Sequence, residues 1–343
     1  MLKELTKSNT IEERFIVRPP QMSDVEDVLE MLEICDLTMV GEIEVSAEML
    51  QKDWTNPTID TNRNFRVVTT QNGRVIAYGE LWDDHDPLVY IWSWNRVHPE
   101  FEGQGIGTYL MNWGENLARN AMVKTPPEVR ITQFADTPST YQPAIDLLVG
   151  QGMKLSRHFY TMKINMAEQP AAPQFTEPIR VRPMCDLDEL PAIINAIDDA
   201  FRDHWGFVEQ SQETVLAHWK HRIESTPYFD PNLWLLALDG DQIAGFSLCW
   251  SRHGADDQMG WIGTLGVLRP WRRQGLGLAL LQQSFSELYQ RGKSKVGLGV
   301  DADSLTGATR LYEKAGMHVT HQVDRYEKEL RPGIDMATRT VEE

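Results

Sequence analysis

The chain repeats one order of secondary-structure signals twice, and this internal repeat constrains its fold more than any other feature. A short apolar strand is predicted at residues 16–19 and again at 181–183, and a helical stretch with an acidic start follows each strand, at 24–35 and 186–201. Later signals also recur at a nearly constant offset. Because 343 residues exceed what one hydrophobic core usually organises, the repeat predicts two related domains.

Both copies continue with the signals of an antiparallel hairpin. Its strands are predicted at 65–70 and 75–82, around Asn72-Gly73, and at 233–238 and 243–250, around Asp239-Gly240. Each copy then contains a third strand (88–97; 260–268), a long amphipathic helix, a fourth strand (129–134; 295–300), a short helix that ends at a Gly-Met pair, and a last strand. The predicted order of each copy is one strand, two helices, three strands, helix, strand, helix and strand. The predicted fold class is α/β, with a mixed sheet in each domain.

The two copies are joined by a segment of different composition. Residues 167–178 contain three prolines and few apolar side chains, which favours a linker over packed structure. We therefore predict an N-terminal domain at 1–166, a linker at 167–178 and a C-terminal domain at 179–343.

Composition and charge exclude several classes of partner. A net charge of -17 repels a phosphate backbone and disfavours nucleic acid, and it would attract a cationic substrate, although an acidic surface for solubility has the same charge. The three cysteines are far apart and lack the spacing of a zinc site or a disulfide framework. No apolar run approaches a membrane span. We expect a cytoplasmic protein without a metal.

A glycine-rich turn follows the third strand of each copy and leads into the long helix. Such a turn gathers unpaired backbone N–H groups at the positive end of a helix dipole, an arrangement that binds phosphate or pyrophosphate. In the second copy, glycines let the backbone approach an anion, and neighbouring side chains add countercharge and a further donor. These residues are Arg272, Arg273, Gln274, Gly275 and Gly277.

This loop and a second motif together resemble the GNAT family of N-acetyltransferases, and the doubled layout resembles its tandem members related to mycothiol synthase. The family's loop is written Gln/Arg, two residues, Gly, one residue, Gly/Ala. Its second hallmark is a short helix with Ala, then Leu-Tyr, then a pair such as Gly-Phe. The chain has Ala308, Leu311-Tyr312 and Gly316-Met317 at this spacing.

The resemblance implies two tandem GNAT folds with acetyl-CoA as co-substrate. The residues that match the family's cofactor contacts are Leu265 and Val267 for the pantetheine arm, the loop from Arg272 to Gly277 for the pyrophosphate, and Ser304, where tandem relatives often carry Asn. Tyr312 matches the residue that protonates the departing thiolate. A phenol with an ordinary pKa of about 10 is protonated at neutral pH, as this role requires.

No proton acceptor is evident on the predicted strand beside the cofactor. Residues 261–267 contain neither a carboxylate nor a histidine, so a water chain is one solution. His204 is another, as an acceptor-binding or proton-relay residue, together with Asp203 and Trp205, because its segment borders the acceptor cleft in GNAT folds. The alternative for His204 is a capping or core role.

The first copy departs from the family's pattern at two positions. Glu102 stands where the second copy has Arg272, and Leu148 stands where it has Tyr312. An acid should repel pyrophosphate, so we predict a degenerate, structural domain. The alternative is that its remaining glycines bind an anion unproductively.

The tryptophans at 82, 92 and 94 are interpreted as packing residues, with ligand stacking as the other possibility.

These observations predict an acetyl-CoA-dependent N-acetyltransferase that acts on the primary amine of a small, cationic molecule or an amino-thiol conjugate, by direct attack. Two alternatives remain: a non-catalytic acyl-CoA binding or sensing protein, and a protein N-terminal or lysine acetyltransferase. A dinucleotide-binding interpretation of the glycine loops fails, because antiparallel hairpins precede them and no βαβ unit surrounds them.

Overall fold

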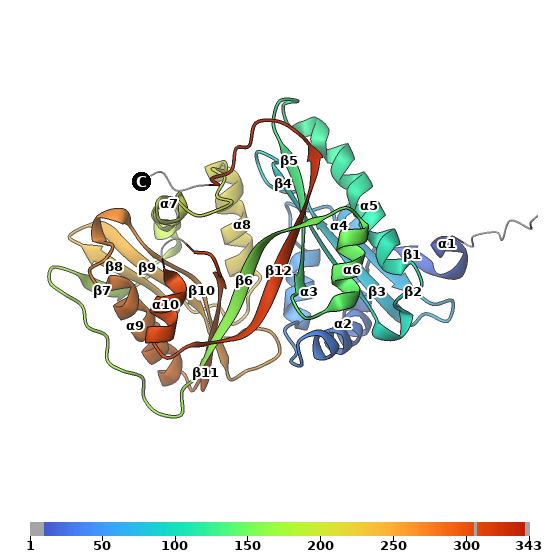
Figure 1. Ribbon diagram of the computed structural model, residues 1–343. Helices are drawn as coiled ribbons and strands as arrows, with labels where there is room; N and C mark the ends of the chain where they lie inside the picture. The colour runs from blue at the N-terminus through green and yellow to red at the C-terminus, as the bar shows by residue number, and fades with distance from the viewer. Residues whose placement is uncertain (1–9, 305–306, 340–343) are drawn as a thin grey trace, which may run out of the picture.

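A single mixed sheet of 12 strands runs through the whole computed structural model, which describes residues 10–304 and 307–339 (Figure 1). The strand order is β1-β2-β3-β4-β5-β12-β6-β11-β10-β9-β8-β7. Helices cover both faces, because successive strand residues point to opposite sides. Tyr78 packs in the cluster beneath α2 and α3, and its neighbour Ala77 packs in the cluster beneath α5.

The first copy follows the predicted order of elements, with one added turn of helix before its hairpin. After α1 (Ile11–Arg14), its elements are β1 (Ile16–Arg18), α2 (Val25–Met39), α3 (Ala47–Trp54), α4 (Thr61–Asn64), β2 (Phe65–Thr69), β3 (Val75–Trp82), β4 (Tyr90–Val97), α5 (Ile106–Ala121), β5 (Ile131–Pro138), α6 (Gln142–Gly150) and β6 (Lys154–Asn165).

The second copy repeats this order. Its elements are β7 (Arg180–Pro183), α7 (Leu190–Phe201), α8 (Gln212–Glu224), β8 (Trp234–Asp239), β9 (Gln242–Trp250), β10 (Met259–Val267), α9 (Leu276–Gln290), β11 (Lys295–Asp301), α10 (Ala308–Lys314) and β12 (His318–Arg331). Both predicted hairpins, β2–β3 and β8–β9, are antiparallel. The prediction of a mixed α/β fold is confirmed.

The last strand of each copy lies on the other copy's side of the sheet. Residues 159–165 of β6 pair with β11 of the second copy, and β12 pairs with β5 of the first. The two exchanged strands also pair with each other at the centre, where they cross in Figure 1. Residues 167–178 form neither helix nor strand. The predicted boundaries therefore divide the sequence into two copies, but the two copies share one continuous sheet.

Within the described ranges, none of the helices combines the length and apolarity needed to cross a bilayer. Residues 1–9, 305–306 and 340–343 lie outside the description. From the sequence we expect a charged and polar stretch at 1–15 and a solvated tail at 338–343, and both ranges fall partly outside the described residues.

Candidate active site

Strands β10 and β11 begin as parallel neighbours and then separate. Residues 259–261 pair with 295–297, whereas β10 continues to Val267 and β11 to Asp301. A bulge interrupts the pairing of β10 with β9 at Gly263, where a Cβ would lie 2.7 Å from a Trp250 ring nitrogen. Beyond the bulge, the side of β10 that faces β11 presents backbone groups that a ligand can bind. Leu265 and Val267 lie on this segment, as predicted.

The glycine-rich loop lies at the far end of this gap and leads into α9. Gly275 is the N-cap of α9, with a left-handed φ of 84° and no heavy atom within 4 Å of an added Cβ. Arg273, Gln274 and Gly275 are exposed. The first turn of α9 leaves N–H groups without intrahelical acceptors, so backbone donors and the positive end of the helix dipole lie at this end of the gap. The predicted binding of a pyrophosphate there stays a prediction.

The Arg272 side chain points away from solvent and contacts the protein itself. Its Nε donates to the Val267 carbonyl at 3.0 Å, Nη2 to the Ala200 carbonyl at 2.9 Å and Nη1 to Asp203 at 2.8 Å. The guanidinium therefore anchors the loop to the end of α7. Its predicted pyrophosphate contact stays a prediction, and Arg273 is the cation of the pair that solvent reaches.

Asp203 accepts hydrogen bonds from two arginines, Arg269 and Arg272. The bond from Arg269, followed by that from Arg272, lowers the Asp203 pKa to about 2. A carboxylate so firmly ionised is a poor proton acceptor at neutral pH. Asp203 is therefore disfavoured as the proton relay relative to His204, the other titratable candidate of this segment.

Tyr312 lies on α10 with 8% of its surface exposed. It belongs to a packed cluster that also contains Leu298 from β11 and Leu265 from β10, which places the ring beside the gap between these strands. Burial raises the Tyr312 pKa to about 12, so the phenol stays protonated throughout the neutral range. Ser304 follows β11 in a turn that its backbone closes with Asp301 and Gly307.

A cavity of about 760 Å³ lies between the two copies and reaches the gap. It is lined by Trp261 of β10 and Gly299 of β11, and also by His204 and Trp205. Burial, followed by the charge of Arg272, lowers the His204 pKa. The imidazole is therefore neutral at neutral pH and has a nitrogen that can accept a proton. An added Cβ on Gly299 would meet nothing within 4 Å, so the strand faces open space.

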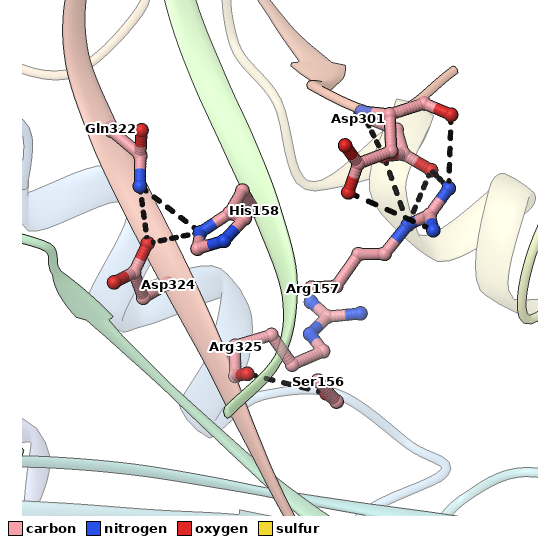
Figure 2. A network of polar contacts seen from close by, with 8 residues as sticks. Ser156, Arg157, His158, Asp301, Gln322, Asp324 and Arg325 are labelled. Atoms are coloured by element: carbon pink, nitrogen blue, oxygen red, sulfur yellow. Dashed lines mark hydrogen bonds and ion pairs between the residues drawn. The ribbon is translucent and has the colours of Figure 1, made fainter. Parts of the chain in front are cut away.

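The exchanged strand β6 contributes a charged pair that sequence reasoning missed. Arg157 donates through Nε and Nη2 to Asp301, with distances of 2.8 to 3.0 Å (Figure 2). Its guanidinium lies 5.3 Å from the Trp205 ring centroid. On the two exchanged strands, His158 Nδ1 lies 2.7 Å from Asp324 Oδ1, and Figure 2 shows this contact. An arginine of the first copy thus holds the end of β11 beside the cavity.

The first copy has the mirrored contact. Arg325 of β12 donates to Asp136 of β5 at 2.9 and 2.7 Å, at the edge where β4 and β5 separate beyond Ser93 and Ala135. No local signal marks either pair, because each joins residues more than a hundred positions apart. Only the strand exchange brings them together.

The loop of the first copy differs from that of the second at the two positions that the sequence comparison identified. Glu102 accepts a hydrogen bond from the Tyr141 hydroxyl, and Leu148 is buried among apolar residues. Helix α1 lies against the loop, where Arg14 donates to the Gln104 carbonyl and side chain at 3.1 and 2.6 Å. A cavity of about 330 Å³ remains beside the glycines. The predicted structural role stays a prediction.

Two further groups bear on the sequence predictions. Trp82 and Trp94 pack against the core beneath α2 and α3, but together with Trp92 they also line a large cavity. Sequence spacing predicted no metal site, whereas Glu42, Glu44 and His321 bring possible ligand atoms within 4.8 Å of one another. Lys163 forms an ion pair with Glu42 and supplies positive charge there, and we assign no metal to the group.

Comparison with known proteins gives consistent matches across both copies. The model of the acetyltransferase (GNAT) family matches residues 27–136 and 190–317. A mycothiol acetyltransferase of Thermobispora bispora is 33% identical over 64% of this chain and 70% of its own length. One from Streptomyces scabiei is 27% identical over 73% of this chain and 75% of its own.

Solved structures agree with these matches. A GCN5-related N-acetyltransferase from Sphaerobacter thermophilus is 33% identical, with a TM-score of 0.80 over 96% of this chain and all of that one. A tandem GNAT protein from the clavulanic acid biosynthesis pathway shares the fold at 14% identity, with a TM-score of 0.69 over 93% of this chain and all of that one.

Proposed function

Since this chain belongs to the acetyltransferase (GNAT) family and is an N-acetyltransferase, we propose that it acetylates the primary amine of a small molecule at the gap between β10 and β11. The family uses acyl-CoA as co-substrate, and we infer that acetyl-CoA is the donor here. When bound, it supplies an activated acetyl group. The observation that carries the proposal is the buried, protonated Tyr312 beside this gap.

The residues of the second copy fit such a donor from end to end. The exposed loop at 273–275 offers backbone N–H groups, the Arg273 charge and a helix N-terminus to the phosphates. The free side of β10 at Leu265 and Val267 offers backbone groups to an amide-containing arm, apart from the Val267 carbonyl, which accepts from Arg272. Open space at Gly299 leaves room beside β11.

The acceptor amine is proposed to enter through the cavity between the copies. This cavity reaches the gap at Trp261 and Gly299 and is bordered by His204. An amine must lose a proton to become a nucleophile, and a neutral imidazole can accept it directly or through a water. Tyr312 holds the proton that the departing sulfur requires.

The decisive variant is Tyr312→Phe, which removes the hydroxyl from a packed ring and changes little else. We expect kcat to fall by about 10²-fold or more, because general acid catalysis contributes on this scale. Free-thiol release should be measured over a panel of small amines, with acetyl-CoA affinity measured by calorimetry. The substitution removes a single oxygen atom and keeps the aromatic ring, so unchanged affinity is the expected control.

The same panel separates the alternatives. Unchanged turnover in Tyr312→Phe would remove the proposed proton donor. Acetyl-CoA binding without turnover of any amine would favour a sensing protein, and turnover of peptide N-termini or lysine alone would favour a protein acceptor.

A further inference from the structure

The first copy contains a cavity of about 770 Å³ that the acetyl-transfer chemistry above does not use. Its floor is formed by side chains of β3 and β4, and its roof by α2, α3 and the segment between them. The lining combines aromatic rings with carboxylates, namely Trp82, Tyr90, Trp92, Trp94, Phe159 and Trp205 with Asp36, Glu44, Asp53, Glu80 and Asp84.

The fold does not require an acid at the floor of this cavity. Glu80 of β3 pairs in register with Trp94, and at the matching register of the second copy Leu248 of β9 pairs with Thr264. Leu248 is fully buried in an apolar cluster beneath α7 and α8. The same position is therefore occupied by an apolar side chain packed in the core of the second copy and by a carboxylate that faces a cavity in the first.

Glu80 has no ion pair among the residues that the structure describes, although only 7% of its surface is exposed. Its side chain accepts a hydrogen bond from Trp82 Nε1 at 2.8 Å. Burial, followed by the charge of Asp53, raises the Glu80 pKa to about 8. A buried acid without a counter-ion is costly unless a ligand supplies the opposite charge.

Other groups in the cavity wall also lack partners. The Tyr90 hydroxyl is buried and has no hydrogen-bond partner in the described structure, and the residue is 9% exposed. Arg96 is a cation in the wall beside these acids, but it stacks 4.2 Å from the Trp94 ring centroid and donates to the Asn95 carbonyl. Arg325, the other arginine in the lining, is held by Asp136. Asp53 and Asp84 have partners outside the lining, Lys52 at 3.4 Å and His218 at 3.1 Å. Within the lining itself, five carboxylates face two arginines.

The cavity adjoins the one that reaches the acetyl-transfer gap, because the two share lining residues. Both are lined by Trp92, Phe159, Trp205 and Gly206, and the second extends to Trp261 and Gly299. A linear molecule held against the acids of the first copy can thus direct its other end toward the second copy.

We propose that this cavity binds one ammonium group of a linear di- or polyamine, with the carboxylates of Glu80 and Asp53 as counter-ions and the faces of Trp82 and Trp94 as cation–π partners. The Tyr90 hydroxyl accepts a hydrogen bond from the same ammonium. The amine at the far end of such a ligand is the one that is acetylated. That this ligand is a substrate rests on the proposed function, whereas the binding site for its ammonium group does not.

The test compares spermidine with n-butylamine on the full-length protein. In the wild type, spermidine is expected to show the higher kcat/KM, and Glu80→Gln should lower the ratio of the two kcat/KM values at least tenfold. Glu100→Gln, at a side chain that is 66% exposed on the surface, is the matched control and should leave the ratio unchanged. Asp53→Asn, from the opposite wall, gives a second variant if Glu80→Gln does not fold.

Calorimetry of spermidine binding to Tyr312→Phe separates this proposal from the proposed function. Binding that is lost in the double variant with Glu80→Gln supports the cavity, even if no amine is acetylated and the acetyltransferase assignment to small amines fails. Acetylation of n-butylamine as efficiently as spermidine, or spermidine binding that is unchanged by both Glu80→Gln and Asp53→Asn, overturns it.

Discussion

The two copies share one order of elements but fill equivalent positions with opposite chemistry. On the inner strands, Tyr78 and Glu80 of the first copy stand where Phe246 and Leu248 stand in the second. The first copy thus has an acidic cavity where the second has an apolar core. At the glycine loops the contrast reverses, because Glu102 is bound to Tyr141 in the first copy while Arg273 faces solvent in the second.

This comparison shows that backbone pairing, rather than these side chains, determines the fold of each copy. The strand registers of β3–β4 and β9–β10 correspond from Glu80 and Leu248 toward the glycine loops, beyond the bulge at Gly263, even though the residues facing the helices differ in charge and volume. Ligand-facing positions are therefore free to diverge without cost to the sheet. The copies are nevertheless not independent, because each completes the other's sheet.

The largest expected effect comes from separating the copies. A fragment of residues 167–343 lacks β6, so β11 loses seven paired residues and β12 loses its central neighbour. We expect no cooperative unfolding transition for this fragment, measured by circular dichroism against urea. Adding residues 1–166 on a second chain should restore the transition. A cooperative transition of the fragment alone would show that the exchange is dispensable.

The next effect concerns the contrast between the two loops. Arg273→Glu places an acid at the exposed loop of the second copy and should weaken acetyl-CoA binding by about tenfold to a hundredfold, since it replaces an attraction with a repulsion. Isothermal titration measures the change. Lys124→Glu, an exposed position on the first copy, makes the same change in net charge. An equal loss in both variants would point to overall charge instead of this loop.

The crossed arginines offer a smaller and more symmetrical comparison. Arg157→Ala leaves Asp301 without its bidentate partner in a region where both side chains are at most 20% exposed. We expect a loss of about 2 kcal/mol in the free energy of unfolding, and a similar loss for Arg325→Ala at the mirrored pair. Urea unfolding tests both. Arg157→Ala should reduce turnover more than Arg325→Ala, because Asp301 ends β11, which borders the acetyl-transfer gap, whereas Asp136 borders the same cavity from β5 of the first copy.

The smallest effect is a dependence of stability on pH. The folded pKa of Glu80, about 8, lies above the unfolded value of about 4.3, so the folded state binds the extra proton. Its stability is highest below the unfolded pKa and falls as pH rises toward 8. Glu80→Gln should remove this fall and be more stable than the wild type at pH 8 by at least about 1 kcal/mol, with little difference at pH 4. Parallel curves of unfolding free energy against pH for the two proteins would contradict this prediction.

Local sequence patterns predicted most of the residues with which the second copy is proposed to bind a cofactor. The hairpin dipeptides, the glycines of the loop and the Leu311-Tyr312 pair act over a few residues, and the structure places them where local geometry requires. The direction in which a long side chain points is not determined by its neighbours in the sequence. Arg272 was expected at an anion, and packing of α7 against β10 supplies three acceptors that turn it inward.

Tertiary structure alone decided which strand completes which half of the sheet. The last strand of either copy has the backbone donors and acceptors to pair beside β5 or β11, so local pattern cannot distinguish exchange from separate closure. The exchange then creates the Arg157–Asp301 and Arg325–Asp136 pairs. It also helps to enclose the acidic cavity, which Phe159 of β6, Arg325 of β12 and Trp205 after α7 line together with Glu80. The sequence alone determined two related folds and one candidate cofactor loop, and the shared sheet decided how the two copies meet.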